Sequence, residues 1–209
     1  MKRLLVLTLA LVLTLSVGYG TMASTIGIGA TEGLTVELYK QIDPSVDPVT
    51  ITGYYGLNEQ LQLSLGYTTK DKKNNDDAYL TLGARYAFVE NIAVYFEYND
   101  YEKEPGTKFG LRGKYSVSDQ LALVGDLNFN KIDDYDWTEI KGQAEYGFND
   151  MVVGNIGFKY SKDDNDSATD IIAGIEVYPI EQVYAFLDYT IVDTKGADDT
   201  IEFGIGYSF

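Results

Sequence analysis

Carboxylates are the side chains of this sequence with the clearest chemical capability. The chain of 209 residues contains 32 Asp and Glu against 16 Lys and Arg, and it has no His and no Cys. Two carboxylates can act as general acid and base, but the candidate pair, Glu139 and Glu145, would lie about 20 Å apart along one strand. Without His the commonest general base and metal ligand are missing, and without Cys no disulfide or thiolate metal site can form. We therefore predict that the chain is not an enzyme and binds neither a metal nor another cofactor.

The charged residues alternate with apolar ones, and this alternation identifies the elements that must position them. Near the end of the chain, Phe203 and Ile205 alternate with Glu202 and Gly204. A period of two residues predicts a β-strand with one apolar and one polar face. Such segments run from Gly33–Lys40 to the end of the sequence. They predict twelve strands of about 9–11 residues, the length of transmembrane strands.

A repeated motif marks the short connections between these strands. Its pattern is Tyr, any residue, apolar, any residue, acid, any residue, apolar, and it occurs at Tyr55–Leu61, Tyr86–Ile92, Tyr115–Leu121 and Tyr146–Val152. Polar stretches separate the remaining strands, and they are Gln41–Pro48, Lys70–Asp77, Asp100–Thr107, Lys131–Trp137, Lys162–Ala168 and Asp193–Asp199. This order predicts antiparallel hairpins with alternately short and longer connections.

Alternation alone does not say which way the apolar face points, because a soluble sandwich would turn it inward and a membrane barrel outward. The apolar face carries no charged residue, as expected where a lipid-facing charge costs about 2–4 kcal/mol, although a buried core would exclude charge too. Aromatic residues at both ends of the strands favour the barrel, since they form the two interfacial girdles of such proteins. The predicted girdle residues are Tyr55, Tyr86, Tyr115, Tyr146 and Tyr207 near the short turns, and Tyr67, Tyr98, Phe129, Tyr160 and Tyr189 towards the longer loops.

The opposite face is polar throughout, as expected for a wet lumen. The predicted pore-lining residues are Glu37, Arg85, Glu97, Arg112, Lys114, Asp126, Glu139, Lys141, Glu145, Lys159, Glu176, Asp188 and Glu202. Four of the acids, Glu37, Glu176, Asp188 and Glu202, fall on strands that become neighbours when a barrel closes. They would form an acidic wall opposite a partly basic one, which orients dipolar solutes and sets ion preference in a pore. The alternative is a salt-bridged network that fills the lumen.

The start of the sequence has the three parts of a secretory signal peptide. Lys2 and Arg3 form a positive n-region, residues 4–17 are apolar or Thr and Ser, and the small residues Thr21 and Ala23 precede Ser24. A retained membrane helix is the alternative, but it needs about 20 apolar residues. We predict a signal peptide of residues 1–23 and a barrel domain of residues 24–209.

The last residues of the chain place an aromatic or apolar side chain at every second position back from a terminal Phe, namely at Phe203, Ile205, Tyr207 and Phe209. In this the sequence resembles the outer-membrane β-barrel, porin-like proteins of diderm bacteria, and the signal peptide and hairpin repeat extend the resemblance over the whole chain. The resemblance implies an all-β fold, a transmembrane antiparallel up-and-down β-barrel. It also implies that these four residues form the recognition signal for the barrel-insertion machinery.

The function that these observations predict is a small passive diffusion pore for small hydrophilic solutes or ions. We expect it in the outer membrane of a diderm bacterium, in contact with lipid and lipopolysaccharide. The acidic balance argues against a nucleic-acid partner, which would require a basic patch. The alternative function is a closed, non-conducting barrel with a structural or surface-binding role through its acidic loops. Those loop acids form either a solvated rim of strand-breaking residues or a bridge through divalent ions to anionic lipid headgroups.

Overall fold

The computed structural model describes residues 33–42, 48–71, 77–101, 104–194 and 198–209. The predicted signal peptide, and the predicted start of the barrel domain at residue 24, lie outside the described residues. The same holds for four of the acidic loop residues, Asp43, Asp47, Asp76 and Glu102. Within the described ranges, no helix has the length and hydropathy needed to cross a bilayer.

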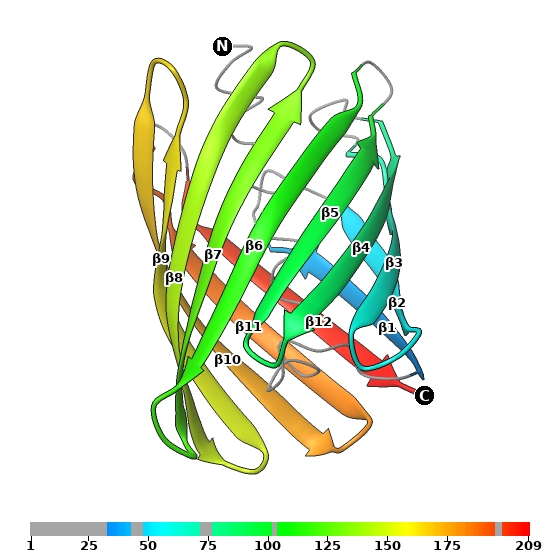
Figure 1. Ribbon diagram of the computed structural model, residues 1–209, viewed down its shortest axis with the longest axis vertical. Helices are drawn as coiled ribbons and strands as arrows, with labels where there is room; N and C mark the ends of the chain where they lie inside the picture. The colour runs from blue at the N-terminus through cyan, green and yellow to red at the C-terminus, as the bar shows by residue number, and fades with distance from the viewer. Residues whose placement is uncertain (1–32, 43–47, 72–76, 102–103, 195–197) are drawn as a thin grey trace.

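Twelve antiparallel strands form a single closed barrel, which confirms the predicted fold class and strand number (Figure 1). Each strand pairs with the next along the chain, and the first strand pairs with the last. The strands are β1 (Gly33–Gln41), β2 (Val49–Gly56), β3 (Leu61–Thr68), β4 (Tyr79–Val89), β5 (Ile92–Asp100), β6 (Gly106–Ser116), β7 (Leu121–Ile132), β8 (Tyr135–Asn149), β9 (Val152–Lys162), β10 (Ser167–Ile180), β11 (Val183–Ile191) and β12 (Thr200–Ser208). Because β1 pairs with β12, the backbone N–H and C=O groups of both strands find hydrogen-bond partners, which is necessary where lipid offers none.

The barrel is polar inside and apolar outside, which settles the direction of the apolar face. Among the described residues, far more polar and charged side chains are buried than hydrophobic ones. Large hydrophobic side chains lie on the outer surface instead, for example Leu65 with 56% of its surface exposed and Ile156 with 62%. A soluble sandwich would bury these residues in its core. The exposed apolar belt is that of a barrel surrounded by lipid.

The girdle positions predicted from the sequence all lie on the outer face of their strands. Tyr55, Tyr86, Tyr115, Tyr146 and Tyr207 are exposed and lie near the short-turn ends of their strands. Figure 1 shows the short turns at the lower rim of the barrel. Charged residues also occur on the outer face, but only at the strand ends next to the longer loops; they are Lys40, Asp100, Lys131, Asp136 and Lys162. There a charge can reach water, so it costs little.

In three of the four repeats, the residue before the acid of the motif caps the short turn. The Asn58 side-chain carbonyl accepts hydrogen bonds from the backbone N–H groups of Gln60 and Leu61, at 2.9 and 2.8 Å. Ser118 accepts equivalent bonds two repeat units further on. Asn and Ser favour turns through such local bonds.

Several of the longer connections are shorter than predicted, including Asp100–Thr107, of which Asp100 belongs to β5 and Gly106 and Thr107 belong to β6. The polar stretch Lys131–Trp137 is not a loop, since β7 continues to Ile132 and β8 begins at Tyr135. The turn between them is Asp133–Asp134, and Asp133 has φ 52°, a left-handed conformation that Asp tolerates. Ser167 and Ala168, also predicted as loop, belong to β10. The strands are therefore 8 to 15 residues long, because beyond the lipid their outer positions can be polar at no cost.

Candidate functional site

All thirteen predicted pore-lining residues lie on the interior face of the barrel, where their side chains are shielded by neighbours. Two further interior charges, Lys108 and Asp170, were not in the predicted set. Both lie an even number of residues from other interior positions of their strands, so the alternation of the sequence could have predicted that they face the interior. Asp170 was obscured because the next interior residue of β10 is the apolar Ile172, which is fully buried.

Four of the interior cations on β6 and β9 form ion pairs along the wall. The Arg112 guanidinium donates to Asp126, from Nε to Oδ1 at 2.6 Å and from Nη2 to Oδ2 at 3.3 Å. The other three pairs join Nζ to a carboxylate oxygen: Lys114 with Glu145 at 3.1 Å, Lys159 with Asp170 at 2.9 Å, and Lys108 with Glu97 at 3.8 Å. Three of the four couple residues that are direct partners in the strand register. The register thus neutralises much of the positive charge of this wall.

Neutral side chains extend this network around the interior. The Tyr95 hydroxyl of β5 donates to Asn128 of β7, and Asn128 Nδ2 donates to Glu139 of β8 at 2.9 Å. On the other side, the Tyr184 hydroxyl of β11 donates to Glu37 of β1 at 2.7 Å. Each of these bonds, like each ion pair above, joins strands that are adjacent or one strand apart. They therefore run along the wall and do not cross the interior.

Interior glycines allow large side chains to lie against the wall. A Cβ atom at Gly110 would lie 2.1 Å from Tyr95 Cζ and 2.6 Å from Asn128 Oδ1. Equivalent atoms at Gly204 and Gly206 would collide with the rings of Phe186 and Tyr184, at 2.3 and 2.1 Å. These rings occupy the space above the glycines, so they extend less far towards the barrel axis.

Substitution of Gly110 by Ala is expected to displace the Tyr95 ring and to cost about 1–3 kcal/mol, the usual penalty of overpacking. Gly53 is the control, since a Cβ there would meet only Leu65 O at 4.0 Å, and Gly53→Ala should change stability by less than about 0.5 kcal/mol. Urea unfolding in phospholipid vesicles would measure both. Equal stability of the two variants would contradict the close packing of Tyr95 on Gly110.

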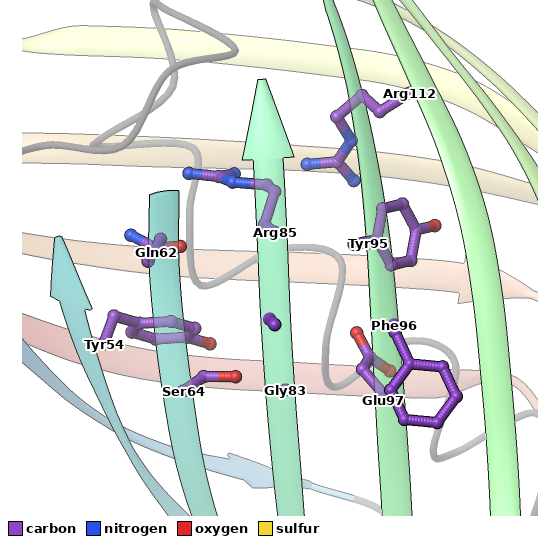
Figure 2. A pocket seen from close by; sticks show the side chains of 10 residues that line it. Tyr54, Gln62, Ser64, Gly83, Arg85, Tyr95, Phe96, Glu97 and Arg112 are labelled. Atoms are coloured by element: carbon purple, nitrogen blue, oxygen red, sulfur yellow. The ribbon is translucent and has the colours of Figure 1, made fainter. Parts of the chain in front are cut away.

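A small cavity opens on the interior side of β2–β6. Figure 2 shows the Arg112 guanidinium pointing towards Arg85, whose own guanidinium extends away from it towards Gln62, with Tyr54 on the Gln62 side and Tyr95 on the Arg112 side. The two guanidinium groups repel each other, and Asp126 attracts both. This part of the wall combines positive charge with amide and hydroxyl groups, so it can hydrogen-bond a polar solute.

The opposite part of the wall carries carboxylates and aromatic rings. Asp188 and Glu202 are direct partners in the register of β11 and β12. Between the acids lies a cluster of Tyr39, Tyr184 and Phe186. The prediction of a uniformly polar interior face was therefore wrong, because glycines on the adjacent strand make room for rings that the period-two pattern assigns to the polar side.

The residues of the predicted insertion signal lie at the end of the barrel. Phe203, Ile205 and Tyr207 are on the outer face of β12, and Phe209 follows the strand with 76% of its surface exposed. The Phe209 N–H donates to Leu34 O at 2.8 Å, and its ring packs edge-on against Tyr207 with centroids 4.7 Å apart. Recognition of these residues by the insertion machinery stays a prediction.

Comparison with known proteins finds a likeness of structure without a likeness of sequence. No family model and no curated protein matches the chain. The KdgM porin covers 84% of this chain over 98% of its own length, with a TM-score of 0.68 at 13% identity, and it has also been solved in complex with disordered oligogalacturonate. The NanC porin covers 85% over 99% of its length, with a TM-score of 0.64 at 11% identity. LpxR from Salmonella typhimurium covers 84% over 99% of its length, with a TM-score of 0.58 at 8% identity.

Proposed function

We propose that this chain, which has the fold of porin-like outer-membrane β-barrels, is an outer-membrane channel through which ions and small hydrophilic solutes diffuse passively. The observation that supports this most directly is the arrangement of the interior. Its ion pairs run around the wall between nearby strands, and its large aromatic rings lie against glycines of the wall. A barrel whose charges served only to fill it would join them across its axis.

The channel is narrow. Interior side chains such as Glu139 and Lys159 have only 2% of their surface exposed, so the remaining path passes between closely packed polar groups. Twelve strands also lie between the eight-stranded barrels that side chains fill and the sixteen-stranded barrels that leave an open channel. We therefore assign the channel to inorganic ions and small solutes.

The interior charge favours cations. Among the described residues of the twelve strands, nine interior carboxylates stand against six interior cations. The carboxylates are those of Glu37, Glu97, Asp126, Glu139, Glu145, Asp170, Glu176, Asp188 and Glu202, and the cations are Arg85, Lys108, Arg112, Lys114, Lys141 and Lys159. Rings of charged side chains select ions of the opposite sign. The oligogalacturonate that accompanies the KdgM porin is an acidic sugar, and an excess of interior carboxylates would disfavour such a solute in this chain.

Single-channel recording tests the proposal. The protein, purified in detergent from outer membranes of an expressing bacterium, would be added to a planar lipid bilayer. We expect discrete conductance steps and, in a salt gradient, a reversal potential that indicates preference for cations. A folded and inserted protein that gives no steps would overturn the channel and favour the closed barrel, with its acidic loops as the contact surface.

A further inference from the structure

Four carboxylates from neighbouring strands form an acidic strip on the barrel interior. They are Glu37 on β1, Glu176 on β10, Asp188 on β11 and Glu202 on β12. The closure of the barrel between β1 and β12 makes these strands consecutive. All four residues are buried. The proposed channel function uses the strip only as part of the net interior charge.

The negative charge of the acidic strip is only partly compensated. The carboxylates of Glu37 and Glu176 repel each other, and the carboxylate of Asp188 repels both. Lys141 on β8 attracts Asp188 and Glu202. However, this lysine is shared with carboxylates of its own wall. Glu37 and Glu176 are thus the two members of the strip with the least compensation among the described residues.

Carboxylate oxygens of the strip are buried without a hydrogen-bond donor. Glu37 has none of its surface exposed, and only one of its oxygens, Oε2, accepts a bond, from Tyr184. The Tyr178 hydroxyl lies beside Glu176, but no bond of good geometry reaches either carboxylate oxygen of that residue. Buried acceptors without donors cost free energy. A bound group that brings N–H donors and positive charge would remove this cost.

Aromatic rings occupy the same part of the wall as the carboxylates. Tyr39, Tyr184 and Phe186 form one buried cluster, and Phe186 is the direct register partner of Glu176. Aromatic faces attract ammonium groups, and most strongly where water is displaced. Carboxylates interleaved with rings are therefore a surface for organic cations more than for hydrated metal ions. In agreement with this, the described residues contain no group of three or more acidic side chains placed to hold one metal ion.

We propose that the acidic strip binds organic cations with two or more protonated amines. The carboxylates stand on four successive strands, so separate ammonium groups can each meet one of them while the carbon chain lies against the rings. This inference rests on the proposed channel function for the path by which the cation reaches the strip.

Calorimetric titration of the purified full-length protein in detergent tests the inference, with the linear diamine putrescine as the probe. Butanediol, which has the same carbon chain without charge, and Mg²⁺ are the comparison ligands. Saturable binding of putrescine with no binding of butanediol and weaker binding of Mg²⁺ is the expected result. Absence of saturable putrescine binding, or tighter binding of Mg²⁺, would overturn it.

Paired variants locate the site. Glu37→Gln with Glu176→Gln should weaken putrescine binding about tenfold or more, because each lost contact is a charge-assisted hydrogen bond. Glu59→Gln with Glu90→Gln removes the same charge from exposed turn residues and should leave the affinity unchanged. Equal affinities in the two double variants would place binding elsewhere. Circular dichroism verifies folding, and Glu176→Gln alone replaces the first double variant if that variant does not fold.

The ring cluster gives a second readout. Phe186→Leu should weaken putrescine binding severalfold through loss of the cation–π contact and leave the binding of Mg²⁺ unchanged. Putrescine binding to a protein that conducts no ions would retain the site and overturn the channel. Conductance without putrescine binding would retain the channel and overturn the binding site.

Discussion

Replacement of Leu65 by Arg is expected to lower the free energy of unfolding in lipid vesicles by about 2–4 kcal/mol, the cost of a positive charge facing lipid near the bilayer midplane. Leu65 lies on the outer face of β3, with 56% of its side chain exposed. Leu65 lies between the two girdles. Leu61, four residues before it, pairs with the girdle residue Tyr86, and the girdle residue Tyr67 comes two residues after Leu65. Urea unfolding, followed by the fluorescence of Trp137, the single tryptophan of the chain, measures the change.

The adjacent residue is the control. Ser64 points to the other side of the same strand and lines the interior cavity next to Glu97. Ser64→Arg introduces the same charge into a polar environment, but it also adds volume, so the Met variant at each position serves as the uncharged reference. Relative to that reference, we expect the charge to cost less than about 1 kcal/mol at residue 64. If the charge cost as much at residue 64 as at residue 65, the assignment of the outer face to lipid would be wrong.

Removal of Arg112 is expected to cost about 3 kcal/mol, because it leaves the buried Asp126 carboxylate without its two-pronged partner. The variant Arg112→Met keeps the length of the side chain and removes its charge. The expected value is at the lower end of the range for broken buried ion pairs, since Lys141 and Lys108 also attract Asp126. Urea unfolding in vesicles again measures the change.

An exposed ion pair and a double variant complete this experiment. Lys131 and Asp136 form a pair at 3.3 Å with more than half of each side chain exposed, so Lys131→Met should change stability by less than about 0.5 kcal/mol. Removal of both charges of the buried pair, in Arg112→Met with Asp126→Leu, should recover at least half of the loss. A double variant as unstable as the sum of its single variants would show that the two residues do not interact.

The period of two in the sequence determined much of the fold. It gave the number of strands, the antiparallel order and the face to which each charged residue belongs. The reason is that successive side chains of a strand point to opposite sides whatever the strand contacts. The turn motif was equally local, since Asn58 and Ser118 cap their turns through bonds to residues two and three positions ahead.

Sequence reasoning failed where the pattern depends on the environment. The stretch Lys131–Trp137 was predicted as a loop because it is polar, but it continues two strands across a tight turn. Outside the bilayer, polarity no longer separates strand from loop. The interior rings of Tyr184 and Phe186 were missed for a related reason, since their places depend on Gly206 and Gly204 of another strand.

The sequence by itself thus determined which residues share a face, because side-chain alternation is a property of the single strand. Only the tertiary structure decided that the apolar face points outward and which charges meet. Lys114 forms an ion pair with Glu145 across an intervening strand, and Lys159 forms one with Asp170 on the adjacent strand. Register, closure and the curvature of the wall set these partners, and all three arise from pairing between strands. By contrast, the sequence had already predicted that closure brings the strand of Glu37 beside the strands of the three acids near the end of the chain, because that follows from strand order alone.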